Sequence, residues 1–206
     1  MAQLDPALDV LRRAQGLADA DKEAADGLLA RADALRAAVS RLAQSAAGAL
    51  KTRVHGDFHL GQVLVAQGDA VIVDFEGEPA RSLDERRAKG SPLRDVAGLL
   101  RSFDYAASVA ASSEASATAT AAAPDRRAAL LERWQSEATA AFLAAYRAAA
   151  AEAPDKWVPA EGEEALLDLF LIEKAAYEVR YEAANRPAWI GLPLRGLAAL
   201  AARVAA

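Results

Sequence analysis

The spacing of apolar residues along the chain predicts a mainly helical protein whose helices are interrupted once, by a short β-hairpin. From Ala25 to Leu50, apolar residues recur at helical spacing, which predicts one long helix that packs on the C-terminal part of the chain. Before it, Asp5 followed by Pro6 is typical of a helix start, with aspartate as the N-cap and proline in the first turn. We therefore expect a first helix that runs from this point towards Leu17.

Residues 51–79 have a different pattern, in which two short apolar runs are joined by turn residues. The first run is Val63–Val65, and the second ends at Asp74. Between them, Gln67-Gly68-Asp69 predicts a tight turn, so the two runs are expected to pair as an antiparallel hairpin. A hairpin of this length returns Asp74 to the neighbourhood of residues 57–62, which precede the first strand.

After residue 80 the pattern is helical again. Ser91-Pro92 is typical of a helix start and predicts a helix over residues 93–105. Residues 106–124 are a low-complexity stretch rich in alanine and serine, with no apolar side chain larger than valine before the final proline. We expect this stretch to be a loop or a fraying helix without a function of its own.

Three more helices are expected in the remainder of the chain. One starts at Pro124-Asp125, one runs over Glu163–Asn185 until Arg186-Pro187 ends it, and one covers Leu194–Val204, with a further break at Trp157-Val158-Pro159. Five large apolar residues of the first of these helices are expected in the core: Leu130, Leu131, Trp134, Phe142 and Tyr146.

Composition and charge exclude several classes of partner and site without identifying the function. The chain has 206 residues, which is enough for one well-packed domain. Its net charge is −5 and the charges are interspersed, so neither nucleic acid nor an anionic membrane is indicated as a partner. The lack of cysteine excludes disulfides and thiolate metal sites. We find no apolar run that would span a membrane and no signal peptide, so we expect a cytoplasmic protein.

Two carboxylates and an amide near the hairpin form a pattern that suits phosphoryl transfer. His55-Gly56-Asp57 opens a loop that runs to Gln62, and the hairpin brings Asp74 back beside it. Asp57 can take the proton from an attacking hydroxyl, whereas Asp74 and the amide oxygen of Gln62 can hold Mg²⁺ against a nucleotide phosphate. The pattern therefore predicts a kinase that uses ATP and Mg²⁺.

The same residues carry a resemblance to a known family. Residues 54–62, VHGDFHLGQ, resemble the HGDxHxxN loop of the protein-kinase-like superfamily, in the form used by aminoglycoside and choline phosphotransferases. Maltokinases are similar in more detail, because they share the glutamine, the segment DFEGEP (residues 74–79) and the stretch RRAKGSPLRDVAGLLRSFDYAA (residues 86–107). The resemblance resumes over EKAAYEVRYEAANRPAWIGLPLRGL, residues 173–197, and covers most of the chain.

The resemblance implies further residues of the catalytic site. Glu76 lies two positions after the metal aspartate, where superfamily members often place an acid, and we expect it to contribute to metal binding. His55 and His59 are the only histidines of the chain. We expect both to fix Asp57 by bonding to backbone carbonyls or carboxylates. Asp95, at the start of the next helix, is expected to brace the catalytic loop from beneath.

Four residues of the helix expected over residues 163–185 lie on one face: Lys174, Tyr177, Glu178 and Tyr181. A cation, two phenols and a carboxylate together suit a polyhydroxylated sugar, although this spacing is also typical of a solvated surface or, for tyrosine, of a core. In maltokinases the disaccharide lies against the similar helix, so the resemblance implies that these residues bind the acceptor. Arg180 is expected to face elsewhere, in solvent.

The fold implied by the resemblance is the C-terminal lobe of an aminoglycoside-phosphotransferase-like kinase, mainly α with a small hairpin. We expect one domain over residues 1–206, with a helical lead-in (1–50), the catalytic loop and metal hairpin (51–79) and a helical substrate-binding part (80–206). A complete kinase of this type also has an N-terminal lobe with a Gly-rich phosphate loop and a strand lysine. No such pattern precedes residue 51, so a missing N-lobe or a fused trehalose synthase is expected as a partner.

Together these observations predict ATP- and Mg²⁺-dependent phosphorylation of maltose to maltose 1-phosphate, with the sugar and the position of transfer implied by the resemblance. Two alternatives stay open. One is a kinase for another small alcohol, such as an aminoglycoside, and the other is a non-catalytic sugar-binding or scaffolding lobe of a fusion protein. The joint presence of Asp57, Gln62 and Asp74 favours catalysis. Without an N-lobe, this chain alone is expected to be inactive.

Overall fold

The computed structural model describes residues 2–45, 47–79, 81–112, 123–154 and 160–205 of the chain. The chain forms two compact units. Unit 1 comprises residues 1–54, 89–97 and 158–206, and unit 2 comprises residues 55–88 and 98–157. Each unit has its own helices, and the β-hairpin belongs to unit 2.

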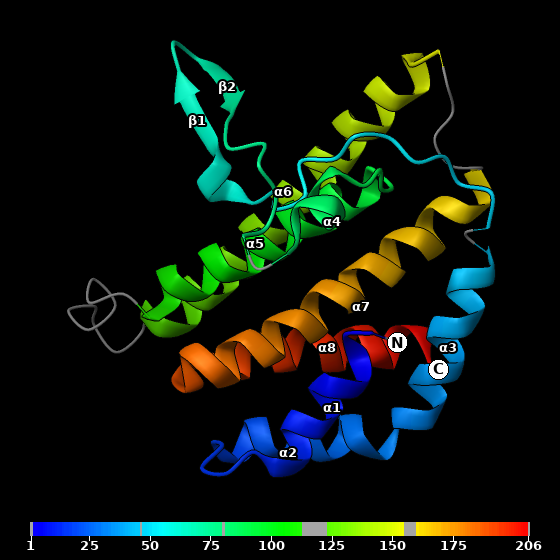
Figure 1. Cartoon of the computed structure of the whole chain (residues 1–206). Coiled ribbons are helices and arrows are strands. Elements are labelled where there is room, and N and C mark those ends of the chain that lie inside the picture. The colour runs from blue at the N-terminus through cyan, green and yellow to red at the C-terminus, as the bar shows by residue number, and fades with distance from the viewer. Residues whose placement is uncertain (1, 46, 80, 113–122, 155–159, 206) are drawn as a thin grey trace. The chain divides into compact units, whose positions relative to one another are not determined.

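Unit 1 is built around one long helix, α7 (Ala160–Asn185). The same unit contains α1 (Leu4–Arg13), α2 (Asp19–Ala30), α3 (Ala32–Ser45) and α8 (Gly191–Val204). Helices α1, α3 and α8 pack directly on α7, whereas α2 packs mainly on α8 (Figure 1). The expected packing of the N-terminal helices on the C-terminal part of the chain is therefore confirmed.

Small side chains on α7 let the neighbouring helices approach closely. Ala175, Ala176 and Val179 are fully buried, and alanine places little bulk between two helix backbones. Larger core residues come from the surrounding helices, among them Leu8, Leu28, Leu35, Leu194 and Leu197. Burial of each such leucine contributes roughly 1.5–3 kcal/mol to folding.

The first helix starts and ends earlier than the sequence predicts. Asp5 lies in the first turn of α1, and the N-cap is Gln3. The Asp5 carboxylate accepts a hydrogen bond from Arg36 Nε at 2.8 Å, so it links α1 to α3 instead of capping its own helix. The helix stops short of the expected Leu17 because the chain turns at Gly16, whose φ of +72° favours glycine.

The single long helix expected over residues 25–50 is in fact two helices. Arg31 separates α2 from α3 and has a φ of −98° and a ψ of 9°, outside the helical range. The break allows α2 to pack on α8 while α3 packs on α7. Because helical apolar spacing continues on both sides of Arg31, the sequence pattern does not reveal the change of direction.

The β-hairpin of unit 2 is confirmed. Strands β1 (Val63–Ala66) and β2 (Asp69–Ile72) pair antiparallel, with Val63 opposite Ile72. Gln67 and Gly68 form the turn, and their φ values of +54° and +84° are the left-handed pair that a tight two-residue hairpin turn requires. The second strand ends before Asp74, which therefore lies in the segment that follows β2.

A short helix that the sequence analysis did not predict follows the hairpin, α4 (Leu83–Arg87). Its N-terminus is a capping box. The Ser82 hydroxyl accepts a hydrogen bond from the Glu85 N–H at 3.3 Å, and the Glu85 carboxylate accepts one from the Ser82 N–H at 2.9 Å. The Ser-x-x-Glu spacing was the available signal for this helix.

The helix after Ser91-Pro92 is longer than predicted. α5 (Leu93–Ser112) begins at the predicted residue, in unit 1, and continues into unit 2. The expectation of a loop is therefore wrong for residues 106–112, where the alanine-rich sequence favours helix. Residues 113–122 of the low-complexity stretch lie outside the described residues. α6 (Ala123–Glu152) then begins next to its predicted start.

Two of the five apolar residues of α6 are not in the core as predicted. Leu130 is 64% exposed and Trp134 is 41% exposed. Trp134 contacts Phe103 of α5 edge to face, with ring centroids 5.9 Å apart. The other three, Leu131, Phe142 and Tyr146, are partly buried. The helix thus contributes a partly buried aromatic layer against α5 rather than a filled core.

The C-terminal helices match their predicted positions closely. α7 ends at Asn185, as predicted, and a short 3-10 helix, η3 (Pro187–Trp189), separates it from α8. The break predicted at Trp157-Val158-Pro159 lies outside the described residues. Among the helices that the structure describes, none is long and apolar enough to cross a membrane.

Leu35→Ala should lower the free energy of unfolding by about 2–5 kcal/mol, because the fully buried side chain would leave a cavity in unit 1. Leu50→Ala is the matched control in the same unit. Leu50 is 49% exposed, and its truncation should change the free energy by less than about 0.5 kcal/mol. Denaturant unfolding followed by circular dichroism measures both variants, and equal losses would contradict the assigned core.

Candidate functional site

The imidazole of His55 joins the loop that carries Asp57 to the segment that follows β2. His55 is buried, and its Nε2 lies 2.7 Å from the carbonyl oxygen of Val73, to which it donates. In that tautomer Nδ1 accepts a hydrogen bond from the Asp57 N–H at 3.4 Å. The ring lies between Phe58 and Phe75, with centroid distances of 5.4 and 4.9 Å. One neutral histidine therefore fixes both backbone segments.

Two glycines bring the same two segments into backbone contact. Gly56 has a φ of +88°, and a Cβ atom there would lie 3.2 Å from the Cα atom of Gly77. A side chain at residue 56 would thus be strained by its own conformation and would also press on the facing backbone. Gly77 has a φ of +75° and packs in turn on the side chain of Arg86. The loop and the segment after β2 are closely packed against each other for this reason.

Helix α5 supports the catalytic loop from its other side within unit 2. A Cβ atom on Gly98 would lie 2.5 Å from the carbonyl oxygen of Phe58, so only glycine permits the observed approach. One turn further, the Ser102 hydroxyl accepts a hydrogen bond from the Leu60 N–H at 3.1 Å. The sequence analysis missed both residues. Their signal was a pair of small residues four positions apart on the helix that follows the loop.

Asp95, which was expected to brace the loop, begins the same helix on the unit 1 side. Its backbone N–H donates to the carbonyl of Pro92 at 3.1 Å, as befits the first turn of a helix. The bracing role of its side chain stays a prediction. Gly98 and Ser102 of the same helix contact the loop directly.

The structure brings the side chains of Gln62 and Asp74 together, as the hairpin predicts. Gln62 Nε2 donates to Asp74 Oδ2 at 2.9 Å, and the Val73 N–H donates to the Gln62 carbonyl at 3.0 Å. Asp74 has a φ of +64°, in the left-handed region that L-residues avoid. Aspartate tolerates this region better than most residues, and such strain tends to persist where the site requires it.

His59 orients the short helix that carries Gln62. Its Nδ1 accepts a hydrogen bond from the Gly61 N–H at 3.0 Å and so caps η1 (Leu60–Gln62). A Cβ atom on Gly61 would lie 2.7 Å from the His59 ring, so the ring folds back only because residue 61 is glycine. His55 thus contacts the loop backbone at Asp57, and His59 contacts it at Gly61.

The side chains of Gln62 and Asp74 are in contact through Nε2 and Oδ2, and an amide oxygen and a carboxylate from such a pair fit the ligand chemistry of a magnesium ion. Asp57, Asp74 and Glu76 do not gather into one acidic cluster. In the part of the chain that the structure describes, no group of three or more His, Cys, Asp or Glu side chains is placed to hold a metal ion. An ion at this pair would take its remaining ligands from water and nucleotide phosphates, as Mg²⁺ commonly does.

Glu76 and Glu78 follow Asp74 in a segment that two arginines hold. The carbonyl of Glu76 accepts a hydrogen bond from Arg86 Nη1 at 3.4 Å, and its side chain is exposed. The Glu78 carboxylate is paired with Arg81 Nε at 3.0 Å. These contacts hold the backbone of the segment in place. Metal binding by Glu76 stays a prediction.

The four residues expected to bind a sugar lie on α7, in unit 1. The Lys174 ammonium lies 5.2 Å from the centre of the Tyr177 ring, and the rings of Tyr177 and Tyr181 stack with their centroids 6.1 Å apart. Glu178 differs from the other three because it is only 7% exposed. Sugar binding by these four residues stays a prediction.

Arg180 was expected in solvent and is instead partly buried. Its guanidinium donates a hydrogen bond to Gln3 Oε1 at 2.6 Å, which links α7 to the N-cap residue of α1. This flank of α7 is therefore used for packing within unit 1.

Known proteins resemble this chain over most of its length. Residues 2–167 match the sequence model of the phosphotransferase enzyme family. A glucosamine kinase of Streptacidiphilus jiangxiensis is 32% identical over 142 residues, which are 68% of this chain and 29% of that protein. A glucosamine kinase of Mycolicibacterium smegmatis is 31% identical over 146 residues, which are 71% of this chain and 33% of that protein.

Solved structures of glucosamine kinases also resemble this chain. Glucosamine kinase in complex with glucosamine, ADP and inorganic phosphate has a TM-score of 0.75 and 27% identity, over 97% of this chain and 42% of that chain. A second crystal form of glucosamine kinase has a TM-score of 0.75 over 98% of this chain and 45% of that chain. The chain thus spans less than half the length of these relatives.

Gly98→Ala should displace the loop that carries Asp57, because the added methyl group would meet the Phe58 carbonyl. We expect a loss of roughly 1–3 kcal/mol in unfolding free energy and shifted amide resonances over residues 55–62. Gly27→Ala is the matched control, since a Cβ atom there meets only Arg31 Nη1 at 3.6 Å. It should be neutral or stabilise α2 by up to about 1 kcal/mol. Unchanged loop resonances in Gly98→Ala would show that α5 does not position the loop.

Proposed function

We propose, on the premise that the chain belongs to the phosphotransferase enzyme family, that it forms the catalytic lobe of a sugar kinase. In this proposal the lobe directs the γ-phosphoryl group of ATP to a sugar hydroxyl. The observation that carries the proposal is the junction at His55. The hydrogen bonds of His55 fix the loop that carries Asp57 to the segment that carries Asp74. Phosphoryl transfer uses a positioned base together with oxygen ligands that hold a metal ion.

Asp57 is the proposed base, which orients the acceptor hydroxyl and takes its proton as the oxygen attacks the phosphorus. Gln62 and Asp74 are the proposed metal ligands, with Glu76 as a further candidate. Bound Mg²⁺ would neutralise charge on the nucleotide phosphates. His55 and His59 act on the loop backbone and are positioning residues.

The nucleotide site is proposed to be completed by a second lobe, as an N-terminal lobe or within a fusion such as one with trehalose synthase. The chain spans less than half of its relatives, which supports this proposal. The hairpin supports it too, because Leu64 and Val71 on one face and Val65 on the other are exposed. A two-stranded hairpin with apolar residues on both faces is marginal unless something covers it. We therefore expect no phosphoryl transfer by the 206-residue chain alone.

Maltose is the proposed acceptor, with transfer to its anomeric hydroxyl to give maltose 1-phosphate. The similarity to maltokinases over residues 74–79, 86–107 and 173–197 supports this choice. Lys174, Tyr177 and Tyr181 are the proposed sugar contacts. Glucosamine is the second candidate, because the relatives are glucosamine kinases.

Asp57→Asn should lower turnover by about 10²–10⁴-fold in an enzyme that joins this chain to a nucleotide-binding lobe, because a positioned base is lost while the loop keeps its shape. Sugar affinity should not change. The control is Asp69→Asn, at the exposed start of β2, and this variant should keep full turnover. Phosphate transfer from labelled ATP to maltose and to glucosamine measures both variants. Equal turnover of Asp57→Asn and the parent would remove Asp57 from the mechanism.

A further inference from the structure

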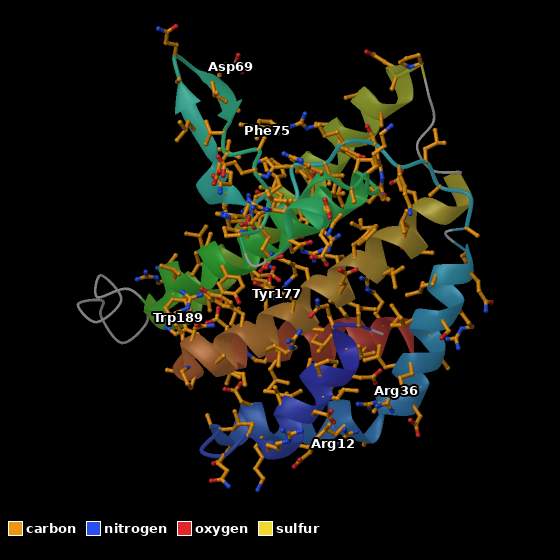
Figure 2. All side chains as sticks on the ribbon, in the orientation of Figure 1. Arg12, Arg36, Asp69, Phe75, Tyr177 and Trp189 are labelled. Carbon is orange, nitrogen blue, oxygen red and sulfur yellow. The ribbon has the colours of Figure 1, made fainter. Side chains whose placement is uncertain are left out.

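Unit 1 contains an open cavity of about 600 Å³, lined both by the connection between α1 and α2 and by the connection between α7 and α8. Figure 2 labels Arg12 on α1 and Trp189 in η3, and each is next in sequence to a residue that lines the cavity. A volume of this size is typical of sites that hold small organic molecules.

Small side chains in the two connections leave this space unfilled. Ala14, Gly16 and Ala18 follow α1, and Ala183 and Ala188 lie at the end of α7 and in η3. Gly16 has a φ of +72°, and no atom outside its chain neighbours lies within 4 Å of the place where a Cβ atom would be. Because glycine and alanine do not reach across to the facing segment, the cavity follows directly from these residue types.

The inner wall of the cavity is apolar. Apart from Asp21, the lining residues that are buried or partly buried are apolar, among them Val10, Leu17 and Ile190. Val10 and Leu17 also pack on the hydrophobic core of unit 1, so the wall is supported by well-packed helices. Such a wall favours a ligand with a hydrocarbon body.

Asp21, the acid in the lining, is already compensated within unit 1. Its carboxylate forms an ion pair with Arg195 and is only 15% exposed. It also lies against the start of α8, where a Cβ atom on Gly191 would collide with it. Asp21 is therefore not placed to attract a cationic ligand.

Arg13, in the last turn of α1, is the cation in the lining, and it is exposed. In the part of the chain that the structure describes, its side chain has no hydrogen-bond or ion-pair partner, whereas the adjacent Arg12 is paired with Asp9 at 2.5 Å. An anionic group at the opening of the cavity would thus meet an arginine that is not engaged elsewhere.

We infer that this cavity is a binding site for a small organic anion, whose hydrocarbon body packs on the apolar wall and whose carboxylate pairs with Arg13. A guanidinium offers two parallel N–H donors that match a carboxylate. Asp57 and Asp74 belong to unit 2, and none of the proposed sugar contacts lines the cavity. The inference therefore does not depend on the proposed function.

The test uses hexanoate, hexanol and hexylamine, which share a hydrocarbon chain and differ in charge. Each is titrated at neutral pH into the ¹⁵N-labelled 206-residue chain, and the amide resonances and the indole N–H of Trp189 are followed. Hexanoate should shift the resonances of residues 14–18 and 187–190. It should bind at least about threefold more tightly than hexanol, because it gains a charge-assisted hydrogen bond at a partly solvated arginine. Hexylamine should bind more weakly than hexanol.

Three variants locate the two parts of the site. Arg13→Gln should abolish the preference for hexanoate over hexanol, whereas Arg12→Gln, the matched control, should keep it. The double variant Ala14→Leu/Ala188→Leu should weaken hexanoate and hexanol alike by at least about tenfold, because filling the space excludes two or more methylene groups. Thermal unfolding shows whether each variant is folded, and Arg13→Gln decides the outcome if the double variant is not.

A preference for hexanoate that disappears in Arg13→Gln and persists in Arg12→Gln, with shifts at residues 14–18 and 187–190, supports the inference. The inference is overturned if the probes shift none of these resonances, if hexylamine binds as tightly as hexanoate, or if the preference survives Arg13→Gln. Unchanged affinity in a folded double variant would also overturn it, because the probes would then bind outside the cavity. None of these results bears on the sugar-kinase proposal, which Asp57→Asn tests separately.

Discussion

The candidate catalytic site depends on one buried imidazole. His55 donates to the Val73 carbonyl and accepts from the Asp57 N–H, so a single ring fixes the distance between two chain segments that each carry an acid. This dual role requires the neutral ring, because a doubly protonated imidazole could not accept the second bond. Gly56 and Gly77 add a steric constraint, since their backbones meet where a side chain would keep them apart. The position of Asp74 relative to the loop follows from these contacts.

The two units differ in how they position side chains. Unit 2 arranges polar groups on a loop, and its precision comes from close backbone approaches at Gly56 and Gly98. Unit 1 is a packed set of helices whose central member, α7, has buried alanines and also carries the stacked pair Tyr177 and Tyr181. A rigid helix in a well-packed core is a suitable support for binding side chains, because their backbone positions are fixed before a ligand arrives.

Local signals in the sequence predicted local structure well. The Gln67-Gly68 turn needs two residues in the left-handed conformation, and the prediction of the hairpin is correct. Arg186-Pro187 ends a helix for steric reasons, and the predicted end of α7 is correct as well. The division at Arg31 was missed because it is set by packing of α2 and α3 on different partners. Leu130 and Trp134 were wrongly assigned to the core, since helical spacing does not say how completely a face is covered.

The sequence predicted the contact between Gln62 and Asp74, but not the residues that support the loop. The pairing of Gln62 with Asp74 follows from the length of the hairpin. The roles of Gly98 and Ser102 depend on α5 lying against the loop, and the four-residue spacing of two small residues does not by itself indicate that contact.

The proposed function requires a divalent cation at Gln62 and Asp74, on the segments that the junction at His55 holds together. Mn²⁺ binds the same kinds of oxygen ligand as Mg²⁺ and broadens nearby resonances, so it reports the location of the ion directly. In a titration of the ¹⁵N-labelled chain with Mn²⁺ and ADP, broadening should begin at the Gln62 side-chain amide and the amides of residues 74–76. It should disappear in Asp74→Asn and persist in Asp69→Asn. Broadening that starts elsewhere, or that survives Asp74→Asn, would contradict the account.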